Sequence, residues 1–145
     1  MLGADRTWSP EQVAELFGDH YGDNRSRRFL GRDHGLVEFF WERAGGRWAG
    51  THFSVQAHRL RSGGPETVNR VIRDRYGVFP GPVTFDEVAA LLAARDVPLV
   101  EVPYPDEIRT YWQPAARIMV YVVAGADYGQ AGDLYRVASS STGIP

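Results

Sequence analysis

The fold is decided by residues 36–60, which read LVEFFWERAGGRWAGTHFSVQAHRL. Apolar and polar side chains alternate on both sides of Ala44-Gly45-Gly46, and such an alternation is typical of half-buried β-strands. We therefore expect two antiparallel strands, residues 36–43 and 47–60, joined as a hairpin.

The register of this hairpin follows from the need to place apolar side chains opposite apolar side chains. A two-residue loop would set Phe39 opposite His52 and mix the two faces. We therefore favour a three-residue loop with a glycine bulge. This register pairs Val37 with Phe53, Phe39 with Thr51, Glu38 with His52, and Glu42 with Trp48.

Helices are indicated by two capping boxes, Ser9 with Gln12 and Thr84 with Glu87, in which two side chains satisfy free backbone groups at a helix start. A proline after two glycines, Pro65, indicates another helix start. The expected helices cover residues 10–17, 65–76 and 85–95. We expect the last helix to bury Phe85, Val88, Leu91 and Leu92.

Further strands are expected at residues 98–102, 108–112, 117–124 and 134–138. Prolines bound the first of these, which suits a sheet edge, and the most apolar, 117–124, suits a central position. Residues 19–35 are expected to form a long loop, with a short strand or helical turn as the alternative. The sequence thus predicts a single α+β domain over residues 1–145, with a flexible tail at 139–145. We expect three helices and a mostly antiparallel sheet of five to six strands, in the order α-β-β-α-α-β-β-β-β.

Composition restricts the function classes. The 145 residues carry a net charge of -2 and no cysteine, which disfavours nucleic-acid binding and excludes disulfides and thiol catalysis. All 16 basic residues are arginine, which stacks on rings and pairs with carboxylates better than lysine does. No apolar run is long enough to span a membrane, and the first residues lack a signal-like apolar segment. We therefore expect a cytoplasmic protein that does not bind membranes.

Catalytic and metal sites have little support in the sequence. His52 and His58 are too far apart on one expected strand to share an ion, and His20 and His34 lack a ligand spacing motif. Glu38, His52 and Ser54 share one strand face, but a serine two residues from a histidine on a strand is too distant for nucleophilic catalysis. We therefore expect a protein without enzymatic activity, bound metal or cofactor.

The outer face of the hairpin is the strongest candidate for a binding surface, because it mixes aromatic side chains with histidine, glutamine and acids. A second candidate is the arginine-rich segment at residues 25–32, where nearby aspartates offset part of the charge. The expected partner-binding residues are Glu38, Phe40, Glu42, Trp48, His52, Gln56 and His58 on the hairpin, and Arg25, Arg27 and Arg28 on the segment before it.

A family resemblance rests on the runs Gly35-Leu36-Val37-Glu38-Phe39-Phe40 and Gln56-Ala57-His58-Arg59-Leu60, on Trp48, and on Gly132-Asp133-Leu134. In this pattern of strands and aromatics the chain resembles small α+β immunity proteins of bacterial polymorphic toxin systems. The resemblance implies a non-catalytic protein that binds and blocks a cognate toxin domain, and it transfers no catalytic residue.

Two other readings remain open at this stage. The first is a small-molecule binder or small enzyme with a pocket between the sheet and residues 19–35, lined by His34, Glu38 and His52. The second is a nucleic-acid-associated module that uses the arginines of residues 25–32. The oligomeric state does not follow from the sequence.

Overall fold

The architecture is an α+β fold with one large antiparallel sheet. The structure, a computed structural model, describes residues 2–63, 65–103 and 107–140. Among them are three α-helices and two 3₁₀ helices: α1 (Pro10–Phe17), α2 (Arg70–Tyr76), α3 (Phe85–Ala93), η1 (Ala57–Leu60) and η2 (Pro65–Thr67). The strands are β1 (Gly22–Arg25), β2 (Phe29–Asp33), β3 (Val37–Ala44), β4 (Arg47–Val55), β5 (Val100–Val102), β6 (Ile108–Gln113), β7 (Ile118–Val123) and β8 (Leu134–Ser139).

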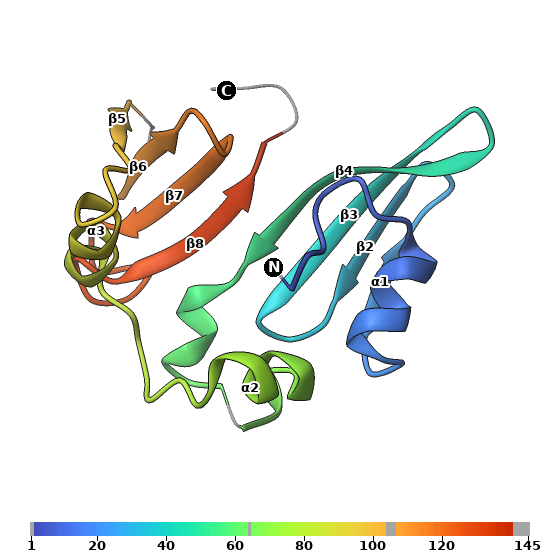
Figure 1. Cartoon of the computed structure of the whole chain (residues 1–145), viewed down its shortest axis with the longest axis horizontal. Helices are drawn as coiled ribbons and strands as arrows, with labels where there is room; N and C mark the ends of the chain where they lie inside the picture. The colour runs from blue at the N-terminus through green and yellow to red at the C-terminus, as the bar shows by residue number, and fades with distance from the viewer. Residues whose placement is uncertain (1, 64, 104–106, 141–145) are drawn as a thin grey trace.

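The sheet has eight strands in the order β1-β2-β3-β4-β8-β7-β6-β5, so the prediction of five to six strands was too low. Each half of the chain folds into its own four-stranded antiparallel meander (Figure 1). Within the sheet the halves are joined where β4 pairs with β8, through Ser54 opposite Ala138 and Val55 opposite Val137. The short strand β5 lies at the edge and β7 lies inside the sheet, as their sequences predicted.

The two missed strands, β1 and β2, lie in the segment that was expected to be a loop. The Ser26 hydroxyl accepts hydrogen bonds from the Arg28 and Phe29 amides and so closes the turn between them. An ion pair between Arg32 and Asp23 then ties the two strands together at 2.8 Å. Polar side chains on an exposed edge strand hid the alternation that normally marks a strand.

The hairpin of β3 and β4 has a different register from the predicted one. Its loop has two residues, Gly45 and Gly46, whose φ angles of +57° and +82° favour glycine. A bulge at Thr51 then shifts the pairing by one residue, so that Phe39 lies opposite Phe53 and Val37 lies opposite Val55. Apolar side chains still face each other, but Glu38 lies opposite Ser54 and His52 lies opposite Phe40.

Both capping boxes are present, at the first turns of α1 and α3. The middle helix differs from the prediction, because residues 65–67 form η2 and α2 begins only after Asn69, which caps it. In α3 the side chain of Leu91 is 58% exposed, so the expectation that it is buried was wrong. The expected tail also begins too early: Ser139 belongs to β8 and is buried, whereas residues 141–145 lie outside the described residues.

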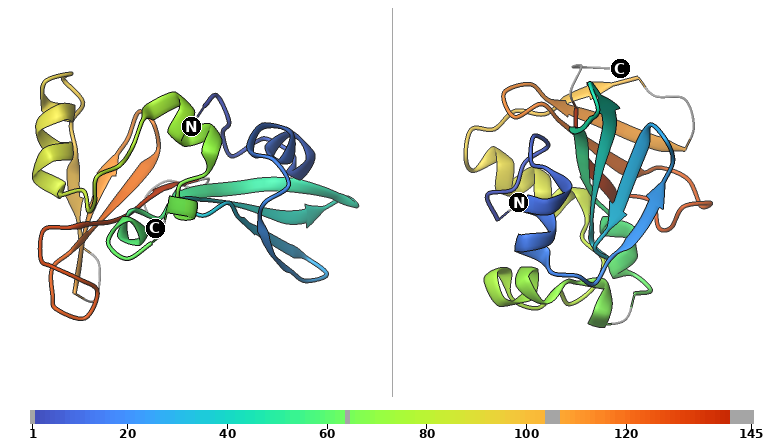
Figure 2. Two further views of the ribbon diagram at one scale, coloured as in Figure 1. Left: turned by 90° about the horizontal axis from the view of Figure 1, so that it is seen from below. Right: turned by 90° about the vertical axis from the view of Figure 1, so that its right-hand side faces the viewer.

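All three α-helices lie on the same face of the sheet (Figure 2, left). In the N-terminal half α1 and α2 bury a core against β3, which includes Val13, Ile72, Phe39 and Trp41. In the C-terminal half α3 covers a second core, which includes Tyr111, Val120 and Val122. The register places these inward residues of both halves on one continuous face, so the other side chains of each strand point to the opposite face.

The segment before α1, which includes Arg6 and Trp8, also packs on the helix-bearing face, against Gly50 of β4. A Cβ atom on Gly50 would collide with the backbone carbonyl of Arg6, and it would lie 3.4 Å from the carbonyl oxygen of Trp8. The Trp8 carbonyl accepts a hydrogen bond from the indole of the buried Trp41 at 2.7 Å. Gly50 therefore allows the N-terminal segment to close over the core.

We predict that Gly50→Ala lowers the free energy of unfolding by about 2 kcal/mol, since the colliding atoms belong to backbone that cannot rotate away. Gly22→Ala is a matched control, because a Cβ atom on this strand glycine meets nothing within 4 Å. Urea denaturation of the two variants measures the difference, and equal stabilities would show that the N-terminal segment moves aside at no cost.

Candidate functional site

The candidate site lies on the face of β1–β4 opposite α1 and α2, which we call the open face. Strand pairing brings nine side-chain positions together there: Asn24, Phe29, Gly31, Asp33, Glu38, Phe40, Glu42, His52 and Ser54. No α-helix of the described residues covers this part of the sheet (Figure 2). The open face therefore presents its side chains across four neighbouring strands.

Three rings form a row across the open face, which we call the aromatic row. Phe40 on β3 stacks on His52 of β4, with ring centroids 4.2 Å apart and planes 13° apart. On its other side Phe40 contacts Phe29 of β2 at 6.0 Å. Burial and then the nearby Arg136 lower the pKa of His52, so its ring is neutral at neutral pH. The aromatic row is thus an uncharged surface of three neighbouring rings.

Beside the aromatic row, two carboxylates are held by an arginine from η1. Arg59 donates to both oxygens of Asp33 at 2.8 and 2.9 Å, and to Glu38 at 2.6 Å. The other oxygen of Glu38 accepts a hydrogen bond from the Gln56 amide at 2.5 Å. Gln56 also donates to the buried Ser54 hydroxyl at 2.8 Å. This network fixes the orientation of both carboxylates.

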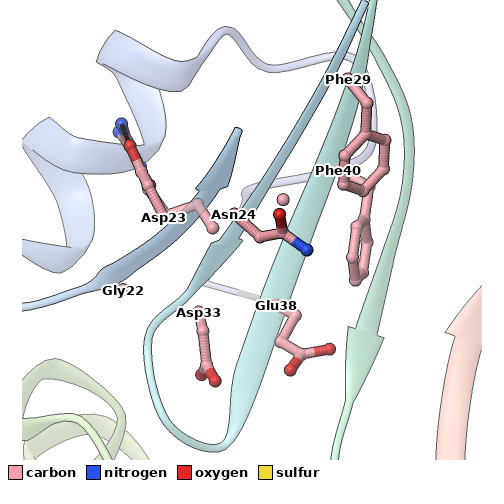
Figure 3. Close-up of a pocket in the computed structure, with 9 residues that line it drawn as sticks. Gly22, Asp23, Asn24, Phe29, Asp33, Glu38 and Phe40 are labelled. Atoms are coloured by element: carbon pink, nitrogen blue, oxygen red, sulfur yellow. Dashed lines mark hydrogen bonds and ion pairs between the residues drawn. The ribbon is translucent and has the colours of Figure 1, made fainter. Parts of the chain in front are cut away.

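A hollow of about 340 Å³ lies over Gly31 on the open face. Its sides are formed by the Asn24 amide, the rings of Phe29 and Phe40, and the carboxylates of Asp33 and Glu38. Figure 3 shows these side chains around the hollow, whereas the side chain of Asp23 points away from it. The hollow exists because Gly31 has no side chain: a Cβ atom there would lie 3.2 Å from both phenylalanine rings.

The same face of the sheet is closed in the C-terminal half. Thr110, Trp112 and Met119 carry their side chains on this face, and all three are buried. At the boundary, the guanidinium of Arg136 lies 4.3 Å from the ring centre of Tyr121, and its Nε has no hydrogen-bond partner. An approaching molecule therefore meets the open face of β1–β4 rather than the whole sheet.

Of the partner-binding residues expected from the sequence, the open face brings together Glu38, Phe40, Glu42 and His52, with Gln56 bound to Glu38. Trp48 does not belong to it, because the bulge places this residue on the opposite face against the first core. The expectation of Trp48 as an outer-face residue was therefore wrong.

The remaining expected residues lie elsewhere. His58 is in η1 rather than on a strand, and it stacks on Tyr135 at 4.6 Å. The guanidinium of Arg25 lies 5.5 Å from the centre of the Trp48 ring, toward the helix-bearing side. Arg27 and Arg28 are exposed in the turn between β1 and β2. The arginine segment is thus part of a hairpin and not a separate loop.

The three residues expected to line a pocket between the sheet and residues 19–35 are not brought together, because β1 and β2 of this segment are strands of the sheet itself. Glu38 and His52 lie on the open face, whereas His34 is 3% exposed and packs beside Phe17 on the opposite face. The imidazole of His52 contacts the Thr51 hydroxyl at 3.2 Å and stacks on Phe40. Glu38, His52 and Ser54 thus do not form a catalytic relay.

Four residues of the site were missed by the sequence reasoning. Asn24, Phe29, Gly31 and Asp33 lie in the two strands that were read as a loop. The adjacent apolar pair Phe29-Leu30 inside the otherwise polar segment was the signal that could have found β2. Arg59 was also missed, since its role depends on how the chain turns after β4.

Metal binding and membrane insertion are two further classes of site. Within residues 2–63, 65–103 and 107–140, no three histidine or acidic side chains are grouped closely enough to hold a metal ion. In the same ranges no helix has the length and apolar character needed to cross a membrane. Comparisons with protein-family models, curated proteins and solved structures gave no match to this chain.

His34 provides the chain's clearest pH-dependent group. Burial, followed by the charge of Arg32, lowers its pKa from 6.5 to about 4. Among the described residues, neither ring nitrogen of His34 has a hydrogen-bond partner. A backbone group of His20 raises the pKa of His34 slightly, but it does not meet the geometry of a hydrogen bond. The folded protein therefore holds His34 as a neutral imidazole at neutral pH.

We predict that stability falls as the pH is lowered through this window. Between pH 6.5 and 4 the unfolded chain binds a proton at His34 that the folded chain excludes, so acid favours unfolding. The loss from this group is about 3 kcal/mol, at ~1.4 kcal/mol per unit of pKa. Denaturation at several pH values should show that His34→Phe removes this part of the pH dependence. An unchanged pH profile would contradict it.

Proposed function

We propose that this chain is a non-catalytic binding protein that docks another protein on the open face. The observation that carries the proposal is the one-sided arrangement of the fold. All three helices cover one face, and the opposite face of β1–β4 carries an aromatic row beside carboxylates held in place by Arg59. Partly exposed rings in a fixed geometry are typical of interface anchors.

The preorganisation of the open face supports protein binding. Phe40 lies between Phe29 and His52 and is stacked on the His52 ring, and Glu38 is held by Arg59 and Gln56. Side chains already held in one rotamer lose little entropy when a partner docks. The residues of the open face come from four hydrogen-bonded neighbouring strands, and this pairing restricts the movement of their backbone. This arrangement favours a partner with a complementary surface patch.

The proposed biological role is that of an immunity-type inhibitor in the cytoplasm. It rests on the resemblance of residues 35–40, 56–60 and 132–134 to small α+β immunity proteins. Two of these runs meet at the open face, since Glu38 is bound by Arg59 and by Gln56. In this role the partner is a toxin domain, and the chain acts by covering a functional surface of it.

A small-ligand site is the second candidate function, favoured by one observation. A cleft of about 690 Å³ between α1 and α2 is lined by His34, whose ring nitrogens have no hydrogen-bond partner, and by Phe17 and Val68. A compound that raises the melting temperature of the native chain, but not that of His34→Phe, supports this candidate.

The partner is first identified by photo-crosslinking in the native host. A photoreactive amino acid replaces His52 on the open face, and in a control it replaces Leu91 on the exposed side of α3. We expect a distinct crosslinked protein from position 52 and none from position 91. Crosslinking only from position 91 overturns the proposal.

With the purified partner, we predict that Phe40→Ala weakens binding by roughly 30-fold or more, as expected for a central aromatic anchor. Phe40 is only half-buried in the free protein, so its stability should fall by about 1 kcal/mol. Leu91→Ala serves as the control and should change neither quantity, because Leu91 is 58% exposed on the helix-bearing side. Calorimetric titration and a thermal melt give the two readouts. Normal binding by Phe40→Ala contradicts the assignment of the open face.

A further inference from the structure

We infer that the hollow over Gly31 is a receptor for a guanidinium group, that is, for an arginine side chain which the partner inserts between Asn24, Phe40 and Glu38. The inference rests on the proposed function for the presence of a protein partner, and it adds the chemistry that the partner must supply. Three features of the hollow lead to it: its net charge, its hydrogen-bonding groups and its aromatic wall.

The first feature is charge. Asp33 and Glu38 carry two negative charges and Arg59 carries one positive charge, so this group keeps one net negative charge. Arg59 does not line the hollow, so the carboxylates separate its guanidinium from the open space. On the opposite side Asp23 is neutralised by its ion pair with Arg32. A ligand with one positive charge would balance the site.

The second feature is the kind of hydrogen bond on offer. Ionised carboxylates are acceptors only, and each oxygen can accept more than one hydrogen bond. Glu38 accepts from Arg59 through one oxygen and from Gln56 and Ser54 through the other, which leaves acceptor capacity on the oxygen that binds Arg59. The side-chain oxygen of Asn24 is a further acceptor at the rim. A guanidinium has five donors and no acceptor, so it matches this set.

The third feature is the wall of the hollow. The rings of Phe29 and Phe40 line it, and both approach Gly31 closely, since a Cβ atom there would lie 3.2 Å from each ring. A cation next to a ring face is attracted by the ring electrons, and a planar guanidinium also stacks on the ring. An ammonium group has no plane to stack. The hollow therefore favours arginine over lysine.

The test uses two small probes: N-acetyl-arginine methylamide and its citrulline counterpart, which has almost the same shape but no charge. Each probe is titrated into ¹⁵N-labelled protein, and the amide signals of the labelled chain are followed. We expect saturable shifts at Gly31 and its strand neighbours with the arginine probe, and at least ~10-fold weaker binding of the citrulline probe. Equal binding of the two probes overturns the inference.

Variants locate the site. Gly31→Ala narrows the hollow, and Glu38→Gln removes its charge, so each should weaken arginine binding at least ~5-fold. Glu38 also binds Arg59, so its substitution could disturb the sheet. Asn24→Ala is therefore the third variant, because Asn24 lies on the exposed edge strand β1 and its loss should not change the fold. Glu42→Gln is the matched control, since Glu42 lies on the open face but outside the hollow. Binding that survives all three hollow variants contradicts the inference.

The outcomes separate this inference from the proposed function. If the arginine and citrulline probes bind with equal affinity while Phe40→Ala still weakens partner binding, the guanidinium site is wrong and the docking face stands. If the arginine probe binds in the hollow but Phe40→Ala leaves the partner's affinity unchanged, the docking face is wrong, and the hollow is a guanidinium site whose ligand does not come from this partner.

Discussion

One extra residue in β4, Thr51, determines which side chains reach which face of the sheet. The tight Gly45-Gly46 turn alone would pair Phe39 with His52, and the bulge moves Phe53 into that position. Beyond the bulge the order of faces is reversed, so Gly50 faces the N-terminal segment and Trp48 faces the core. The core and the open face both depend on this single irregularity, because side chains alternate strictly along a strand.

The 3₁₀ helix η1, which follows β4, connects the two halves of the molecule, which the sheet alone joins through few residue pairs. β4 and β8 share only two residue pairs. Shortly after β4, Ala57 enters the core beneath α3, His58 stacks on Tyr135 of β8, and Arg59 turns to the open face. Three successive residues thus bind the second core, the second half of the sheet and the carboxylates of the candidate site. The geometry of the open face is thereby coupled to the packing of both halves.

The candidate site also depends on a glycine in β2. Gly31 is the one position in its row without a side chain, and its neighbours across the strands are Asn24 and Phe40. A larger residue would fill the space that the rings and carboxylates surround. The site is therefore a property of neighbouring strands, in which a glycine creates the hollow and an arginine from η1 orients the acids beside it.

Elements whose signals are local could be predicted from the amino-acid sequence. The capping boxes at Ser9 and Thr84, the alternation in β3 and β4, and the apolar run of β7 all predicted structure that is present, because they depend on neighbouring residues. Only the tertiary structure decided the bulge at Thr51, the edge strand β1 and the role of Arg59. These features gain their stabilisation from residues distant in the chain: the N-terminal backbone over Gly50, the partner strand of β1, and the carboxylates of β2 and β3. Such contacts override local propensity, since packing and ion pairing are satisfied only once the sheet has assembled.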